Sequence, residues 1–449
     1  MGSFFETFRN AWKTPDLKRK IIYTLLLLLI FRIGCQVPIP GISANALGQV
    51  FGSGTGIGDF FNVISGNAAR NVSIFAMSIT PYINASIIIQ LLTVAIPALE
   101  RLAKDGGEEG KKKLGQISRY TTVGLALFQG FFIANNLRLN GYFYITPDWF
   151  GMILVMASLA AGTAFLMWLG EQITDKGIGN GISLLIFAGI VSNGPGGVVK
   201  LYDTFLKGPD KVIMQGILYI AVILLLFFVV IGAVIFITEA ERRIPVQYAK
   251  RVVGRKMYGG NSTVIPIKIN SSGVLPIIFA MSIVAFPSTI ISLFFGNLVS
   301  SANAANHPIL TGIVNFGRSG SIWYPVIQAL LVIGFTFFYS AVYFNPKEIS
   351  DNLKDNGGFI PGIRPGKPTT DFIKTVSNKI TMAGAIFLAL ITVLPMIVQI
   401  ILKNINSDFS TINLWLGGTT ILILVGVALE TVKQIESHML ARYYRGFLE

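Results

Sequence analysis

Long stretches without a single charged residue constrain this chain more than any other feature of its sequence. They lie at Leu125–Leu137, Gly151–Gly170, Val212–Thr238, Ser271–Leu310 and Ile380–Leu402. A run of about 20 apolar residues matches the thickness of a bilayer core. These runs are apolar on every face, whereas the helices of a soluble protein carry one apolar stripe. The sequence therefore predicts a membrane protein with many spans.

Composition argues against several classes of chemistry. Charged residues make up 13% of the chain, about half the share that is usual in soluble proteins. Cys35 is the only cysteine, so no intrachain disulfide can form. His307 and His438 lie far apart and are expected at the solvated surface, and no cluster has metal-ligand spacing. We expect neither a metal nor a cofactor, and the sequence has no phosphate-binding GxxxxGK[ST] loop.

Ten segments are predicted to span the membrane: Ile21–Val37, Val72–Pro97, Ile117–Ala134, Phe150–Leu169, Ile178–Val191, Val212–Ile237, Gly273–Phe295, Trp323–Phe344, Ile380–Leu402 and Ile412–Glu430. An even number places both termini on one side. Most of the 36 lysines and arginines lie in the terminal segments and the connections on that side, which the positive-inside rule assigns to the cytoplasm. The first segment could instead be a cleaved signal peptide, but Arg32 and VPIPG follow its apolar run without a small-residue cleavage site.

One predicted span carries many polar residues. The stretch ITPYINASIIIQLL begins at Ile79, and Ile79, Ile83, Ser86 and Gln90 share one face of a helix. This face is too polar for lipid and suits either a helix interface or a water-accessible path. Pro81 removes a backbone hydrogen bond and predicts a local break in the helix. The stretch alone does not decide between these two interpretations.

A glycine-rich segment precedes that span. It reads GSGTGIGDFFNVISGNAARN, and Asp59 could cap a short helix from Phe60 to Ser65. Such a helix is too short to cross a membrane. Beside a full span it predicts a re-entrant element lined by protein or by water. The alternative is an ordinary outer loop.

The charged residues favour a passive pathway over catalysis or ion coupling. Asp59 in GxGD and Asp203 in YD resemble the signature of intramembrane aspartyl proteases, but both lie in outer connections and in the reverse order. Ion-coupled carriers keep carboxylates or lysines deep inside their spans, whereas this chain has almost none there: Arg32 is in the first span and Glu430 ends the last. The alternatives to a passive channel are a small-solute secondary transporter and a membrane enzyme.

Six motifs resemble one known family. They are FRIGCQVPIPGI from Phe31, SITPYINASIIIQLLTV from Ser78, FLMWLGEQITDKGIGNGISLLIFAGI from Phe165, RRIPVQYAKR from Arg242, FNPKEISDNLKDNGGFIPGIRPG from Phe344 and LGGTTILILVGV from Leu416. In this order they resemble the SecY family, whose members are the channel subunits of bacterial protein translocases.

The resemblance implies an all-α polytopic fold of ten transmembrane helices around an hourglass pore. Two inverted, pseudo-symmetric five-helix halves would comprise residues 1–192 and 212–431. Residues 193–211 would form the hinge connection between them, and residues 432–449 a cytoplasmic tail. Two long cytoplasmic loops, 239–272 and 345–378, would lie in the second half.

The resemblance also implies site residues at the pore. The family's constriction is a ring of aliphatic side chains, here Ile79, Ile83, Ile186, Ile278 and Ile423. Its plug, at about 58–66, would include Asp59, Phe60, Phe61, Asn62, Val63 and Ile64. Its lateral gate, a seam between the second and seventh spans, would include Asn84, Ser86 and Gln90.

The basic loops imply partners by the same route. The positions that match the family's docking site for the SecA ATPase or the ribosome are Arg242, Arg243, Lys250, Arg251, Arg255, Lys256 and Arg364. Clustered lysines and arginines suit RNA phosphates, although positive-inside topology alone explains some of them. Small SecE-like and SecG-like membrane subunits, signal sequences, unfolded preproteins and lipids complete the expected partners.

Overall fold

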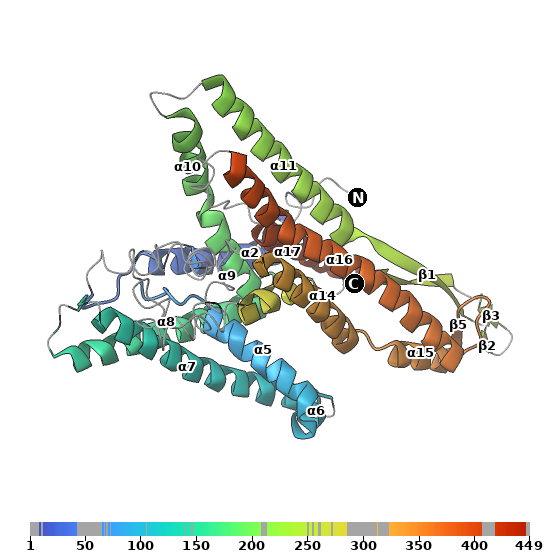
Figure 1. Ribbon diagram of the computed structural model, residues 1–449. Helices are drawn as coiled ribbons and strands as arrows, with labels where there is room; N and C mark the ends of the chain where they lie inside the picture. The colour runs from blue at the N-terminus through green and yellow to red at the C-terminus, as the bar shows by residue number, and fades with distance from the viewer. Residues whose placement is uncertain are drawn as a thin grey trace. The chain divides into compact units, whose positions relative to one another are not determined.

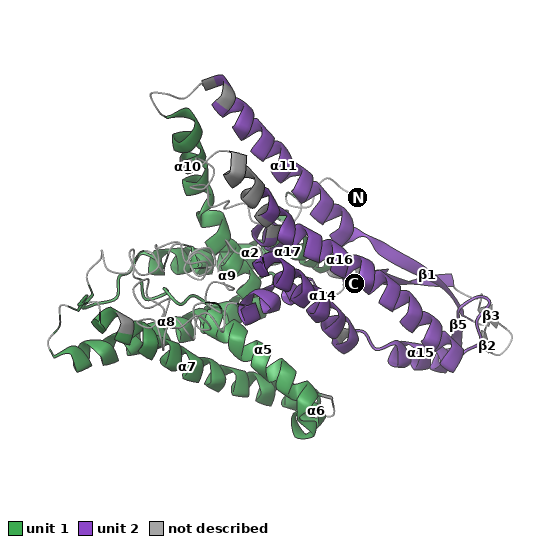
Figure 2. Cartoon of the chain, in the orientation of Figure 1, with its two compact units in different colours: residues 1–207, 285–321, 427–449 green, residues 208–284, 322–426 purple. Residues whose placement is uncertain are grey.

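A computed structural model describes most of the chain, and within it the protein is mostly helical (Figure 1). The described residues are 9, 12–42, 65–66, 68, 71, 73–104, 106–139, 141–143, 145, 147–207, 213–248, 251–253, 256–258, 262–270, 273–284, 312, 323–405 and 418–445. The chain divides into two compact units. Unit 1 comprises residues 1–207, 285–321 and 427–449, and unit 2 comprises residues 208–284 and 322–426 (Figure 2).

Unit 1 is built from helices. They are α2 (Pro15–Gly34), α5 (Thr80–Ala95), α6 (Pro97–Lys104), α7 (Gly107–Leu139), α8 (Asp148–Lys176), α9 (Gly181–Ser192), α10 (Gly194–Leu206) and the second part of α17 (Gly418–Arg445). Helix α10 lies in the connection that was predicted as a hinge. The hydrophobic run through this connection allows α9 and α10 to form one apolar stretch, Gly181–Leu206.

Two prolines set the ends of α5. Pro81 lies in the first turn of the helix, where the amide hydrogen it lacks has no intrahelical partner in any case. The predicted break at Pro81 is therefore wrong, because this proline starts the helix. Ile96 is extended, with φ −107° and ψ 114°, as expected before Pro97. The chain bends there by 105° into α6.

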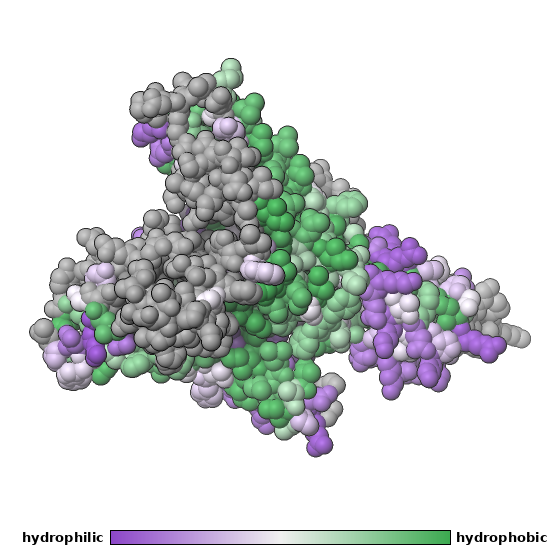
Figure 3. All heavy atoms as spheres, viewed as in Figure 1, coloured by the Kyte–Doolittle hydropathy of each residue, from purple (hydrophilic) through white to green (hydrophobic). Residues whose placement is uncertain are grey.

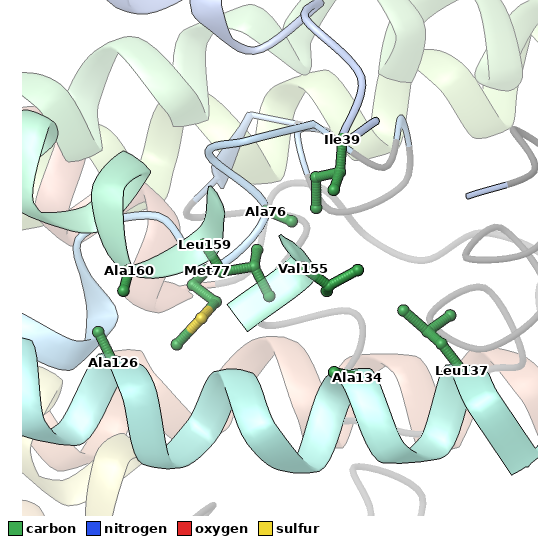
Figure 4. Close-up of a cluster of buried hydrophobic side chains, with 9 residues drawn as sticks. All are labelled: Ile39, Ala76, Met77, Ala126, Ala134, Leu137, Val155, Leu159 and Ala160. Carbon is green, nitrogen blue, oxygen red and sulfur yellow. The ribbon is translucent and has the colours of Figure 1, made fainter. Parts of the chain in front are cut away.

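Small residues let α7 and α8 pack closely. Figure 4 shows the cluster that they form with the chain after α2 and the turn before α5. Its members are Ile39, Ala76, Met77, Ala126, Ala134, Leu137, Val155, Leu159 and Ala160. Four of them are alanines. Lipid is as apolar as the helices themselves, so helices in a membrane associate through close packing, which small side chains permit.

Unit 2 combines helices with a small sheet. Its helices are α11 (Ile213–Glu239), Leu275–Val284, α14 (Trp323–Tyr343), α15 (Pro346–Asp355), α16 (Lys367–Ile405) and the start of α17. Its strands are β1 (Glu241–Tyr248), β2 (Arg251–Val253), β3 (Lys256–Tyr258), β4 (Ser262–Lys268) and β5 (Gly358–Phe359). Strands β2 and β3 pair with each other, and the other three form a sheet in the order β4-β1-β5.

The three-stranded sheet corrects the all-α prediction for the two long loops. Strand β1 runs antiparallel to β4, with Ile244 opposite Ile265, and antiparallel to β5. One face of it packs on α15, the turn after β5 and the start of α16, in a cluster that includes Ile244, Val246, Ile267, Leu353, Ile360 and Ile373. The alternation of apolar residues in RRIPVQY and STVIPIK is the period-two pattern of a half-buried strand. Both segments therefore carry a strand signal in their sequence.

The surface of unit 2 is divided into a hydrophobic region and a hydrophilic region. Figure 3 shows hydrophobic residues over α11 and α16 and hydrophilic ones at the end that carries the sheet and α15. Among the described residues, five helical stretches are long and apolar enough to cross a membrane. The bent pair α5 and α6 would make a sixth. The protein is therefore a multi-pass membrane protein, whereas the count of ten spans stays a prediction.

The close packing of α8 generates a stability prediction. A Cβ atom at Gly162 would collide with the carbonyl oxygen of Ile74 and lie 2.8 Å from its Cγ2 atom. We expect Gly162→Ala to lower the free energy of unfolding by about 1–3 kcal/mol, measured as an earlier loss of monodisperse protein on heating in detergent. Gly124→Ala on α7 meets open space and should not destabilise the protein. Equal melting of the two variants would contradict this packing.

Candidate functional site

The start of α5 places the first two predicted ring residues. Ile79 is the N-cap of the helix, and Ser78 before it has φ +52°, a left-handed conformation that is uncommon for serine. The amide of Ile83 donates to the carbonyl of Ile79 over 3.1 Å. The two side chains therefore lie one turn apart on the same face of the chain. Both are buried, with 1% and 9% of their surface exposed.

The other three predicted ring residues are also buried and come from three further helices. Ile186 lies on α9, Ile278 on Leu275–Val284 and Ile423 on α17, and all are less than 10% exposed. Within unit 2, Val274 packs 3.6 Å from the position that a Cβ atom would take at Gly426. Val274 and Gly426 are one turn away from Ile278 and Ile423, so the two helices meet near these isoleucines. The closed ring itself stays a prediction.

The predicted gate residues are half-buried on α5. The side-chain amide of Gln90 donates to the hydroxyl of Ser86 over 3.5 Å, and the hydroxyl of Thr93 donates to the carbonyl of Gln90 over 2.6 Å. Ser86 and Gln90 thus share a face, as the sequence predicted. Both hydrogen bonds lie within α5 and do not cross an interface, so they need not break when a neighbouring helix moves. The role of Ser86, Gln90 and Asn84 as a gate stays a prediction.

The predicted plug residues Asp59 to Ile64 lie outside the described residues, but the chain just after them is firmly held. The guanidinium of Arg32 donates to the carbonyl of Gly66 over 2.7 Å. The Cys35 thiol lies 3.7 Å from the carbonyl oxygen of Ser65. A charged side chain inside a span is costly unless polar groups surround it, and these contacts explain how Arg32 is accommodated in α2.

The basic end of unit 2 presents two predicted docking residues on β1. Arg242 and Arg243 are exposed, and the Arg243 guanidinium lies 2.8 Å from the Glu241 carboxylate. Lys250 and Arg255 lie outside the described residues. Arg251 and Lys256 begin the short strands β2 and β3, and only their backbone is described.

Arg364 stands at the tip of a fixed turn between β5 and α16. Its carbonyl accepts from the Thr369 hydroxyl over 2.8 Å, and the Gly366 carbonyl accepts from the Ser350 hydroxyl over 3.0 Å. Gly362 and Gly366 have φ +83° and +97°, a conformation that glycine adopts without strain. The Arg364 side chain is exposed. These hydrogen bonds and glycine conformations hold the turn that presents this arginine.

The structure gives no support to a catalytic carboxyl pair at the described positions. Asp203 lies on α10, and its carboxylate is 3.6 Å from the Lys207 ammonium at the surface. Asp59 lies outside the described residues. Among those that are described, no group of three or more histidine, cysteine or acidic residues could hold a metal ion.

Sequence reasoning missed one group of polar contacts altogether. The connection from α8 to α9 donates its backbone amides to side chains of Thr24 on α2, Thr174 on α8 and Gln434 on α17. These residues are far apart in the sequence and of common types. Only the glycine spacing of KGIGNG marked this connection as special.

The chain matches a family model and curated relatives over almost its whole length. The SecY family model covers residues 73–432. The protein translocase subunit SecY of Thermotoga maritima is 43% identical, over 99% of this chain and 98% of its own. The SecY subunit of Halalkalibacterium halodurans is 41% identical, over 99% of this chain and 100% of its own.

Solved structures share the fold at lower identity. A structure described as that of a protein conducting channel matches with a TM-score of 0.59 and 17% identity, over 94% of this chain and 92% of its own. Sec61 in the canine ribosome-channel complex from the endoplasmic reticulum matches with a TM-score of 0.53 and 15% identity, over the same shares. A family model across most of the chain and full-length relatives above 40% identity agree on one assignment. The chain belongs to the SecY family.

Proposed function

We propose that this protein is a passive protein-conducting channel of the cytoplasmic membrane. It moves unfolded secretory polypeptides across the membrane and releases the helices of membrane proteins sideways into lipid. The observation that carries this proposal is the 43% identity to a protein translocase subunit over 99% of the chain. Proteins this similar over their whole length share a fold, and the relatives are translocase subunits, so we infer the function from the family.

The five isoleucines would act as an apolar seal. A narrow apolar constriction excludes water and so resists the passage of ions. Isoleucine offers no hydrogen bonds to a passing chain, and its β-branched side chain has few rotamers, which keeps the opening narrow. The burial of all five residues supports this role. The plug, residues 58–66, would fill the outer side of the same constriction at rest.

The seam next to α5 would serve as the exit to lipid. Asn84, Ser86 and Gln90 make this helix more polar than a lipid-facing span needs to be. Polar contacts between helices in a membrane are weak, at about 0.6–2 kcal/mol each. Such a seam can therefore part when a signal sequence competes for it, and close again afterwards.

The basic end of unit 2 would receive the partners that supply energy. Arg242, Arg243 and Arg364 are exposed there, on a sheet and a turn held by a hydrophobic cluster. We propose that the SecA ATPase or the ribosome docks on them, and that catalysis of ATP hydrolysis belongs to the partner. Sec61, which shares the fold, is described in a ribosome-channel complex. SecE-like and SecG-like subunits would complete the assembly in the membrane.

The positive-inside pattern supports the proposed topology. Ten spans with both termini in the cytoplasm place the exposed arginines of β1 on the cytoplasmic side. The proposed halves are residues 1–192 and 212–431, joined at 193–211. A small-solute secondary transporter, the alternative, is not favoured, because the relatives are translocase subunits and few charged residues lie in the spans.

Depletion of the protein from its cell tests the function directly. Precursors of secreted proteins should accumulate with their signal sequences uncleaved, because no route across the membrane remains. Pulse labelling followed by precipitation of one secreted protein measures this. Export at the normal rate would overturn the proposal, as would saturable, gradient-driven uptake of a small solute by vesicles that carry the protein.

The apolar seal predicts a leak when it is opened. Ile83→Ser should raise the resting ion conductance of the channel in planar bilayers several-fold, because a small hydroxyl both widens and wets the constriction. The matched control is Ile88→Ser on the same helix, where the side chain is exposed. If both variants conduct like the original protein, Ile83 does not line the constriction.

The docking proposal predicts a charge effect that depends on position. Arg364→Glu should slow SecA-driven export about tenfold, because it places a repulsive charge in the contact. Arg364→Lys should be intermediate, since lysine keeps the charge but loses the two-pronged hydrogen bonds. Lys354→Glu on the exposed side of α15 makes the same charge change and should have little effect. Equal export by both reversals would contradict a specific role for Arg364.

A further inference from the structure

We propose that Gln434 on α17 is a positioning residue that fixes the start of α9 and, through it, the side chain of Ile186. The inference rests on the proposed function, in which Ile186 is part of the seal. Helix α17 would then have two roles: it carries the ring residue Ile423, and its Gln434 positions the ring residue Ile186 of α9. The contacts that carry the inference all lie within unit 1.

The connection between α8 and α9 has side-chain acceptors from three helices. The amide of Ile178 donates to the Thr24 hydroxyl over 3.1 Å, and the amide of Gly179 donates to the Gln434 side-chain oxygen over 2.8 Å. The amide of Gly181 donates to the Thr174 hydroxyl over 2.9 Å. Buried amides without partners are costly, so these acceptors hold the connection in one conformation.

The shortest of these three bonds depends on a close approach that only glycine allows. Gly179 has φ +88°, and a Cβ atom there would lie 2.9 Å from Leu184 Cδ1 and 3.3 Å from Thr431 Oγ1. Thr431 is one turn before Gln434 on α17. The backbone at Gly179 is thus pressed against α17 at the point where Gln434 accepts its amide hydrogen.

A small apolar layer supports the same junction. Leu17 and Ile21 of α2 cluster with Ile178 of the connection and Ile435 of α17, and Met439 packs against them. Hydrophobic contact brings the helices together but does not fix the direction of a backbone amide. The hydrogen bond from Gly179 to Gln434 provides that direction, because hydrogen bonds weaken steeply when they are bent.

Helix α9 transmits the position of this connection to Ile186. The side-chain oxygen of Asn180 accepts from the amides of Ile182 and Ser183, over 3.1 and 3.3 Å, which ties the connection to the first turn. Ile186 lies one turn beyond Ile182, on the same face of a helix of only 12 residues. It is 3% exposed. A shift of the connection should therefore move Ile186 by a similar amount, because the short helix between them moves as a unit.

The test uses Ile186→Cys in the full-length protein as a reporter of position. Whole cells are treated with a membrane-impermeant maleimide, and the labelled fraction of the purified chain is followed by mass. The chain that keeps Ile186 gives the background from Cys35, which is buried. In the reporter chain, Gln434→Met keeps the size of the side chain but removes its strong acceptor. Gln434→Glu keeps an acceptor oxygen at the same distance along the side chain.

We expect Gln434→Met to raise the labelling rate of the reporter thiol about threefold to tenfold, the effect of losing one hydrogen bond. Gln434→Glu should restore the original rate within twofold. The matched control is Glu436→Gln on the exposed side of α17, which should leave the rate unchanged. If Gln434→Met does not accumulate in the membrane, Gln434→Asn, whose acceptor is one carbon short, takes its place with the same expectation.

Ile83→Ser, which opens the proposed seal, separates failure of this inference from failure of the proposed function. If it raises the labelling of the reporter thiol but Gln434→Met does not, Gln434 has no positioning role and the inference is overturned while the seal stands. If Ile83→Ser leaves the reporter thiol unlabelled, Ile186 does not line the constriction. The proposed role of Ile186 and the inference then fall together.

Discussion

The structure depends on one requirement, that every backbone polar group in an apolar environment finds a partner inside the protein. Helices meet this requirement along their length, and side chains meet it where helices end. Arg32 donates to the carbonyl of Gly66 at the end of the proposed plug, and Thr24, Thr174 and Gln434 accept the amides between α8 and α9. Some of the polar side chains inside this protein thus satisfy backbone groups where its helices are interrupted. A channel that must open needs breaks, and these contacts allow them to exist in a stable protein.

Charged residues are also confined to particular parts of the protein. The apolar helices carry few ionised groups, while the sheet and the turn of unit 2 carry exposed arginines. They lie at the end that Figure 3 shows as hydrophilic. A passive channel has no use for ionised groups within its seal, because a fixed charge there would attract counter-ions and hold a passing chain. Its proposed partners, in contrast, would be recognised by charge. The two tasks therefore occupy different parts of the sequence, and each can change with little effect on the other.

Much of this could be predicted from the sequence, and the rest could not for physical reasons. Continuous hydrophobic runs predicted helices within all ten proposed spans. The start of α5 was predicted wrongly, because Pro81 suits the first turn of a helix as well as it breaks one. The sheet was not predicted, because its strands are short and lie in loops rich in charged residues. Gln434 could not be predicted, since its partner is 255 residues away in the sequence and only the fold brings them together.

The unbroken length of helix α16 limits how the chain can change in evolution. It begins at Lys367, contributes Ile373 to the hydrophobic cluster that packs on the sheet, and continues without a break through an apolar stretch that reaches Leu394. Each residue of a helix turns it by about 100°. The loss of a single residue from the middle of α16 would therefore swing the arginine-bearing surface around the axis and point it at a different neighbour. Length changes here would be tolerable only in near-whole turns, so this helix would act as a fixed spacer between the proposed docking surface and the apolar stretch.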